Sequence, residues 1–123
     1  MHNYIRLTVL ALAACQITAA IPAAAAPSTS QGQISVAQVL DMVEKAPKDA
    51  TARNVLTAYL GGLGEAAGML VSLKPGSCAK SLSLDANRVR QVLANGMAAG
   101  RQVETAATPI ILRDMLDRAG CRD

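Results

Sequence analysis

Residues 49–73 read DATARNVLTAYLGGLGEAAGMLVSL, the longest stretch of the chain with apolar residues at helical spacing. Residues three and four positions apart share one face of a helix, so this stretch predicts a long helix. Either Asp49 or Thr51 can cap it, and it should run to about Leu73. The residues expected on its buried face are Val55, Leu56, Tyr59, Leu60, Leu63, Ala67, Leu70 and Leu73.

Four glycines lie inside this predicted helix, at positions 61, 62, 64 and 68. Each costs about 1 kcal/mol relative to alanine in a helix interior, so the cluster predicts a kink or a very close helix neighbour. Gly64–Gly68 and Gly96–Gly100 both have the Gly-x-x-x-Gly spacing that allows two helices to approach closely. We expect this crossing within the chain, and a seam between two copies of a homodimer is the alternative.

A short helix is predicted before this stretch. Ser35 with Gln38 three residues later forms a capping box at its start. Pro47 ends it, because proline cannot continue the helical hydrogen-bond ladder. Its apolar stripe is Val36, Val39, Leu40 and Val43.

Two more helices are predicted after it. The first begins at Ser83, with Asp85 near the positive end of its dipole. The second has Thr108 as its N-cap and Pro109 as its first residue, and ends at Gly120. The first buries Leu84, Val89, Val92, Leu93 and Met97, and the second buries Ile110, Ile111, Met115 and Leu116.

The composition agrees with this pattern. The chain has 123 residues with no Trp, no Phe and two Tyr, so its core must consist of Leu, Val, Ile, Met and Ala. Such side chains favour close helix packing over an aromatic-centred sandwich. We therefore expect an all-α fold, a compact bundle of about four helices that forms one domain over residues 34–123.

The first 25 residues have the pattern of a secretory signal peptide. A short basic opening precedes an apolar run from Leu7 to Ile21, and small residues follow. Cleavage after Ala25 would release the protein into the periplasm, with residues 26–33 as a flexible mature N-terminus. The alternative is a lipid anchor at Cys15. A membrane span is not expected, because the run is short and breaks at Pro22.

Removal of this leader takes Cys15 with it and leaves two cysteines, Cys78 and Cys121. Thiols oxidise outside the bacterial cytoplasm, so we expect these two to form a disulfide. It would close a loop of about 44 residues, which is worth about 4 kcal/mol in the chain-entropy model.

Several function classes are disfavoured. The single histidine is His2, inside the leader, so the mature chain lacks the usual metal ligand and general base. A net charge of +3, with no basic tract and no aromatic set, does not indicate nucleic-acid binding. We therefore expect no enzyme activity, no metal and no cofactor.

Two local patterns have simpler explanations. Ser77 and Lys80 match the Ser-x-x-Lys spacing of penicillin-binding enzymes, but the other motifs of that class are missing and the chain is too short. Arg88, Arg90 and Arg101 are expected on solvated surface, with an acidic partner as the alternative.

The layout of residues 49–121 resembles the amidase-immunity proteins of type VI secretion, the Tai/Rap family. The resemblance rests on Tyr59-Leu60-Gly61, on Cys78, on the helix from Ser83 and on a last helix that ends at Cys121. The chain departs from the family in lacking a cysteine just before Tyr59 and prolines beside its two cysteines.

This resemblance implies a small exported helical protein that binds and inhibits a cell-wall amidase without catalysing a reaction. Its partner-binding candidate is the predicted turn Lys74, Pro75, Gly76 and Ser77. The alternative is a periplasmic acid-stress chaperone similar to the HdeA-type proteins, which one disulfide also holds together.

Overall fold

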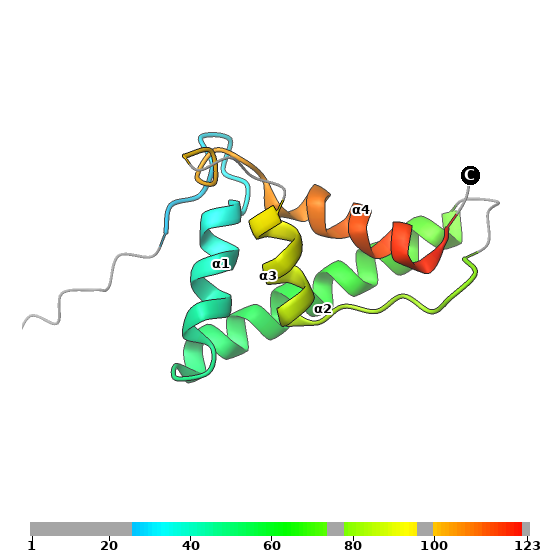
Figure 1. Cartoon of the computed structure of the whole chain (residues 1–123), viewed down its shortest axis with the longest axis horizontal. Helices are drawn as coiled ribbons and strands as arrows, with labels where there is room; N and C mark the ends of the chain where they lie inside the picture. Colours follow the sequence, from blue (N-terminus) through cyan, green and yellow to red (C-terminus); the bar gives the residue numbers. More distant parts are fainter. Residues whose placement is uncertain (1–25, 74–77, 96–99, 122–123) are drawn as a thin grey trace, which may run out of the picture.

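The computed structural model describes residues 26–73, 78–95 and 100–121. The predicted leader, with Cys15, lies outside the described residues, as do the turn Lys74–Ser77 and Met97. The described chain forms a four-helix all-α bundle with one disulfide (Figure 1). Its helices are α1 (Val36–Lys45), α2 (Ala50–Leu73), α3 (Ala86–Asn95) and α4 (Ala107–Ala119).

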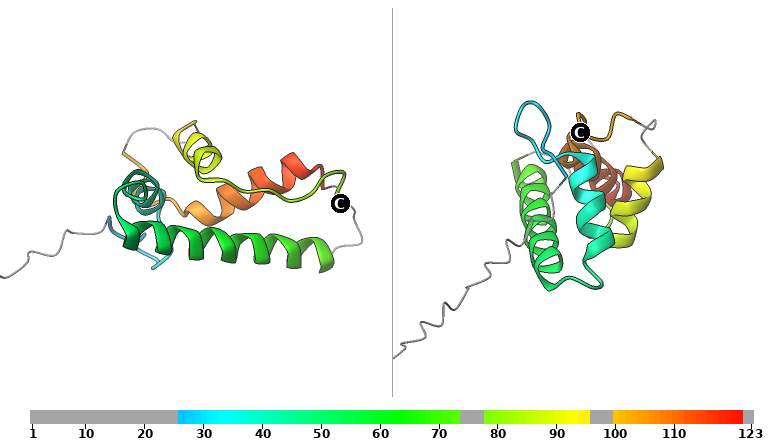
Figure 2. Two further views of the ribbon diagram at one scale, coloured as in Figure 1. Left: turned by 90° about the horizontal axis from the view of Figure 1, so that it is seen from below. Right: turned by 90° about the vertical axis from the view of Figure 1, so that its left-hand side faces the viewer.

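The helices form two layers. Figure 2 shows α2 as one straight helix along one side, with the other three helices above it. Within this arrangement α1 packs on α2 and α3, and α4 packs on α2 and α3. The predicted kink in α2 is absent.

The main core lies where α1, α3 and the start of α4 meet above α2. It contains the aliphatic side chains that the composition predicts, and burying each Val, Leu or Ile among them stabilises the fold by about 1.5–3 kcal/mol. Its buried members are Val36, Val39, Val43, Leu56, Leu63, Val89, Leu93, Ala107 and Ile111.

The start of α1 confirms the predicted capping box. The Ser35 hydroxyl accepts from the backbone N–H of Gln38 at 3.1 Å, and the Gln38 side chain accepts from the Ser35 N–H at 3.0 Å. The same hydroxyl donates to the carbonyl of Pro27 at 2.8 Å. Ser35 is fully buried, and these bonds satisfy its polar atoms.

Residues 26–33 differ from the flexible segment that we expected. Thr29 is buried, and its backbone N–H donates to the Gln33 carbonyl at 3.0 Å. The Ser30 N–H and hydroxyl both donate to Glu104, at 3.1 and 2.8 Å. These two hydrogen bonds lower the pKa of Glu104 and tie this segment to the loop before α4.

Asp49, not Thr51, caps α2. Its Oδ1 accepts from the N–H groups of Thr51 and Ala52, at 2.7 and 3.1 Å. At the next helix the predicted start at Ser83 is wrong: α3 begins at Ala86, and Asp85 is its cap, accepting from the Arg88 N–H at 2.9 Å.

The predicted N-cap of the last helix is also wrong. α4 begins at Ala107, and its N-cap residue Ala106 has no side-chain cap. The Ala107 N–H, at the first residue of α4, donates to the Ile34 carbonyl at 3.0 Å, so a distant backbone segment satisfies one of the free N–H groups of the first turn. Thr108 bonds the Tyr59 hydroxyl at 3.0 Å, and Gly120, with φ 66°, ends α4 as predicted.

The choice between the two α2 caps is testable by substitution. Asp49→Ala should lower the free energy of unfolding by about 1 kcal/mol, because two N–H groups lose their acceptor. Thr51→Ala should leave it unchanged or raise it slightly, since alanine is the better helix former. Urea unfolding of both variants measures the difference, and equal losses would contradict the assignment.

Candidate functional site

The first candidate interaction surface is the solvent-exposed side of α2, because this helix is apolar and only partly buried. By length and composition α2 is apolar enough to cross a membrane, with a mean hydropathy of 1.3 over 18 residues. A core helix of a soluble domain meets the same criterion, but here only 17% of that window is buried. Four large apolar side chains of α2 are exposed, namely Val55, Met69, Leu70 and Leu73, and clustered apolar side chains on a surface typically mark an interaction site.

The predicted buried face of α2 is only partly right. Leu56, Leu63 and Ala67 are buried, and Tyr59 and Leu60 are half-buried. Val55, Leu70 and Leu73 are exposed to 51%, 41% and 76%. Because a single layer covers α2, the helix buries a narrow stripe, and apolar residues to the side of that stripe or beyond Ala67 remain in solvent.

The glycines of α2 have no close neighbour among the described residues. A Cβ added at Gly61, Gly62, Gly64 or Gly68 would meet nothing within 4 Å. The intramolecular crossing expected at Gly64–Gly68 is therefore wrong. Gly96 lies outside the described residues, and Gly100 is a turn residue with φ 102°. The four helical glycines cost about 1 kcal/mol each, with no packing gain inside the chain.

The last two turns of α2 carry an apolar cluster, which we call the α2 tip: Met69, Leu70 and Leu73. Met69 is 65% exposed. Leu73 directly precedes the turn Lys74–Ser77, the predicted partner-binding candidate, which is outside the described residues. The α2 tip is therefore adjacent in the sequence to that candidate site.

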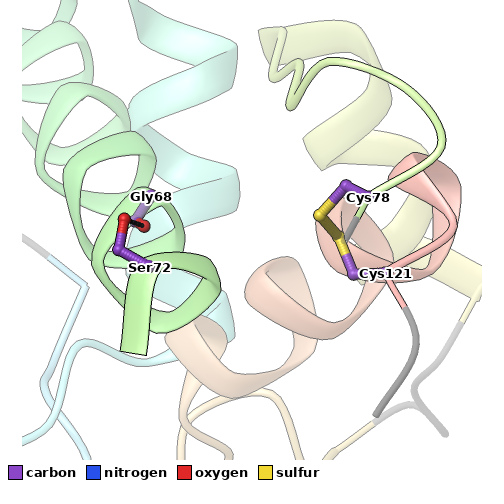
Figure 3. The surroundings of a disulfide bond; sticks show 4 residues. All are labelled: Gly68, Ser72, Cys78 and Cys121. Atoms are coloured by element: carbon purple, nitrogen blue, oxygen red, sulfur yellow. Dashed lines mark hydrogen bonds between the residues drawn. A yellow bond between two sulfur atoms is a disulfide. The ribbon is translucent and has the colours of Figure 1, made fainter. Parts of the chain in front are cut away.

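The disulfide between Cys78 and Cys121 is present as predicted (Figure 3). It joins the residue after the turn to the end of α4. The Lys80 N–H donates to the Ala119 carbonyl at 2.9 Å, so backbone pairing continues the link. Gly120 also lies close, since a Cβ there would come within 3.2 Å of the Ala79 Cβ. Cys78, Ala79 and Lys80 are therefore held against the end of α4.

Asp114 connects α3 and α4. Its carboxylate accepts from Arg88 Nη2 at 2.6 Å and from Arg118 Nε at 2.8 Å. Arg118 in turn donates to the Ser83 carbonyl at 2.8 Å. These contacts correct the expectation for Arg88, which pairs within the chain, whereas Arg90 and Arg101 are exposed.

The pKa of Asp114 lies below its ordinary value, chiefly because Arg88 donates to the charged form, with Arg118 adding to the effect. The pKa of Arg88 is raised by the same pair. Sequence reasoning missed this cluster, although the four-residue spacing of Asp114 and Arg118 is a helical ion-pair signal. No sequence pattern indicates that Arg88 meets them.

Two surface hollows accompany these features. A groove of about 490 Å³ between α3 and α4 is lined by Val92, Asn95, Pro109, Ile110, Arg113, Asp114 and Asp117. A more apolar hollow of about 320 Å³ lies by α1 and α2.

Within residues 26–73, 78–95 and 100–121 no three His, Cys, Asp or Glu side chains cluster to hold a metal. Ser77 is outside those residues, so its spacing to Lys80 has no structural test.

The contribution of the disulfide to stability is measurable on the oxidised chain. Cys121→Ser should lower the free energy of unfolding by about 4 kcal/mol, because the open chain gains entropy when unfolded. Reduced wild-type protein should unfold at the same urea concentration as the variant. An unchanged midpoint, or free thiols in the oxidised protein by alkylation and intact mass, would contradict this account.

The Asp114 cluster predicts an acid-dependent stability. A carboxyl with a lowered folded pKa stabilises the fold above its unfolded pKa of about 3.9, and this contribution is lost as the pH falls through the folded value. Asp114→Asn should thus be less stable than wild type at pH 7, and the difference should shrink below pH of about 4. The control Asp41→Asn breaks an exposed pair within α1 and should have little effect at either pH. Urea unfolding at a series of pH values gives both curves.

No protein-family model, curated protein or solved structure matches the chain significantly. The function is therefore argued from the fold and its surfaces.

Proposed function

We propose that this protein is exported to the periplasm and acts there by binding another protein, without catalysis of its own. The observation that carries this proposal is the α2 tip, where Met69 and Leu73 are 65% and 76% exposed on a rigid helix. Large apolar side chains at the end of a supported element are typical anchors for a partner's pocket. The disulfide fixes the chain just beyond this site.

In its most specific form, the partner is a secreted cell-wall amidase and the protein is its immunity-type inhibitor. This form is supported by the resemblance to the Tai/Rap family, in which Tyr59 lies on a long helix and two helices follow Cys78. In the described chain Tyr59 lies in the middle of α2, and α3 and α4 follow Cys78. The resemblance therefore concerns the order of the helices along the chain and the positions of Cys78 and Cys121.

Inhibition would follow from occlusion. The α2 tip is followed directly in the sequence by Lys74–Ser77, the predicted partner-binding candidate. Apolar side chains seated in the cleft would exclude both water and the peptidoglycan substrate. Full burial of an exposed Leu or Met side chain would contribute about 1.5–3 kcal/mol to binding.

The binding test uses the oxidised chain, purified from the periplasm, as bait for cell-wall hydrolases of its own organism. A captured amidase is then purified and titrated against the wild type and variants. Leu73→Asp should raise the Kd about 30-fold or more, which corresponds to about 2 kcal/mol at an anchor residue. Its melting temperature should not change, because Leu73 is exposed.

Val55→Asp is the matched control for this test. Val55 is exposed and apolar on the same helix, but it lies about four turns before Met69, the first residue of the α2 tip. It should leave the Kd for the amidase unchanged. Equal losses for both variants would contradict a site at the α2 tip, and an amidase that neither binds nor is inhibited would contradict the immunity proposal.

A second candidate is an acid-stress chaperone of the HdeA type, favoured by the Asp114 cluster. Protonation of this carboxylate removes an ion-pair link between α3 and α4, so acid should loosen the bundle and expose its aliphatic core. Circular dichroism and client aggregation at pH of about 2–3 test this function. An unaltered fold there, or no suppression of aggregation, would reject it.

A further inference from the structure

The apolar hollow beside α1 and α2 has the composition of a site for an ammonium group. Its volume of about 320 Å³ lies within the range of small ligand sites. Asp41 is the single charged side chain of its lining. Tyr59, the one aromatic residue outside the predicted leader, also lines it, and aromatic rings attract cations. The full lining is Ala26, Ile34, Gln38, Asp41, Met42, Ala52, Val55 and Tyr59.

The first described residue of the chain lies at this hollow. Ala26 lines it, and the next residue, Pro27, is fixed because its carbonyl accepts from the buried Ser35 hydroxyl at 2.8 Å. On α1, which Ser35 caps, Gln38 and Asp41 are three residues apart, so they share a face of the helix, and both line the hollow. The backbone nitrogen of Ala26 is therefore held at the same hollow as the Asp41 carboxylate.

We propose that this hollow binds the chain's own mature N-terminus, the ammonium group that removal of the leader creates at Ala26. The inference rests on the export in the proposed function, and it specifies cleavage after Ala25 rather than a lipid anchor at Cys15. In the uncleaved chain the Ala26 nitrogen belongs to a neutral amide. Hydrolysis of that bond adds one water and leaves a carboxylate on Ala25 and an amine on Ala26. The amine is mainly protonated at neutral pH, because its ordinary pKa is about 7.7–8.0.

Asp41 is suited to receive this ammonium group. Its Oδ2 accepts from Lys45 at 2.8 Å, one turn further along α1, whereas its Oδ1 has no donor among the described residues. An ammonium group in the hollow can therefore bind Oδ1 without displacing Lys45. Tyr59 is the other titratable group of the lining, and its hydroxyl bonds Thr108 at 3.0 Å.

The chain's own N-terminus fits the hollow better than an amine of another molecule. Ala26 already forms part of the lining, and the segment that follows it is held by two contacts, from Ser35 to Pro27 and from Ser30 to Glu104. An ammonium group on this segment has a high effective concentration at the hollow. An external amine would in addition lose translational freedom on binding.

The first experiment identifies the N-terminus of the exported chain and titrates it. Intact mass should give a chain that begins at Ala26, and a lipid-bearing chain from Cys15 or any other start would overturn the inference. The Ala26 methyl carbon, followed by NMR over a pH series around about pH 8, reports the pKa of the α-amino group. We expect this pKa above about 8.0, because the Asp41 carboxylate favours the charged form.

Three substitutions locate the carboxylate that binds the N-terminus. Asp41→Asn should lower the α-amino pKa by about 0.5, the effect of one partly exposed ion pair. Val55→Asp should raise this pKa, since it adds a second carboxylate to the lining from α2. Glu44→Gln is the matched control, because it removes an exposed carboxylate of α1 that lies outside the lining. It should leave the α-amino pKa unchanged.

The titration is a more direct readout than stability. Asp41 is 34% exposed, and exposed ion pairs contribute little to the free energy of unfolding. An α-amino pKa that Asp41→Asn leaves unchanged, or that Glu44→Gln lowers equally, would overturn the proposal.

Amidase binding by the same variants separates this inference from the proposed function. Asp41→Asn should leave the Kd for the amidase unchanged, because the hollow lies about four turns of α2 from the α2 tip. The expected titration without amidase binding would count against the immunity proposal alone. A processed chain with an unaffected titration would contradict this inference alone, whereas a chain that keeps its leader would contradict export and this inference together.

Discussion

The Cys78–Cys121 disulfide holds together the end of the molecule that lies outside the main core. That core gathers residues of α1, α3, the middle of α2 and the start of α4. Towards the other end fewer of the described side chains are buried than in the main core, and those buried there include Ala67, Met115 and Ala119. A covalent link there limits the opening of α4 away from the segment that leads to α3, where the aliphatic contacts alone are few.

In addition to the disulfide, polar contacts connect separate segments of the chain at both ends of the molecule. Arg118 and Arg88 converge on Asp114 and so join α3, α4 and the segment before α3. At the other end Ser35 binds Pro27, and Ser30 binds Glu104, so the residues after the predicted leader become part of the domain. The carboxylates of both clusters have lowered pKa values, which makes each contact weaken in acid.

The exposed side of α2 changes in chemistry along the helix. Towards the middle of the helix several exposed positions carry small or polar residues, such as Ala58, Gly61 and Glu65. The α2 tip carries long apolar side chains next to a predicted turn, and Met69 and Leu73 are the most exposed of the large apolar side chains in the described part of α2.

Local sequence determined the helices and their ends where the decisive contact is local. The capping box of Ser35 and Gln38, the stop at Gly120 and the all-α class follow from side chains a few residues apart. The expectation of export, with two cysteines left after the predicted leader, indicated the disulfide. Tertiary structure decided what depends on distant partners. The carbonyl of Ile34 accepts a hydrogen bond from the N–H of Ala107, where α4 begins, and Arg88 of α3 pairs with Asp114 of α4. Because only one layer covers α2, Val55, Leu70 and Leu73 remain exposed to solvent. Periodicity identifies which residues share a face of a helix, but the number of neighbouring helices determines how much of that face is buried.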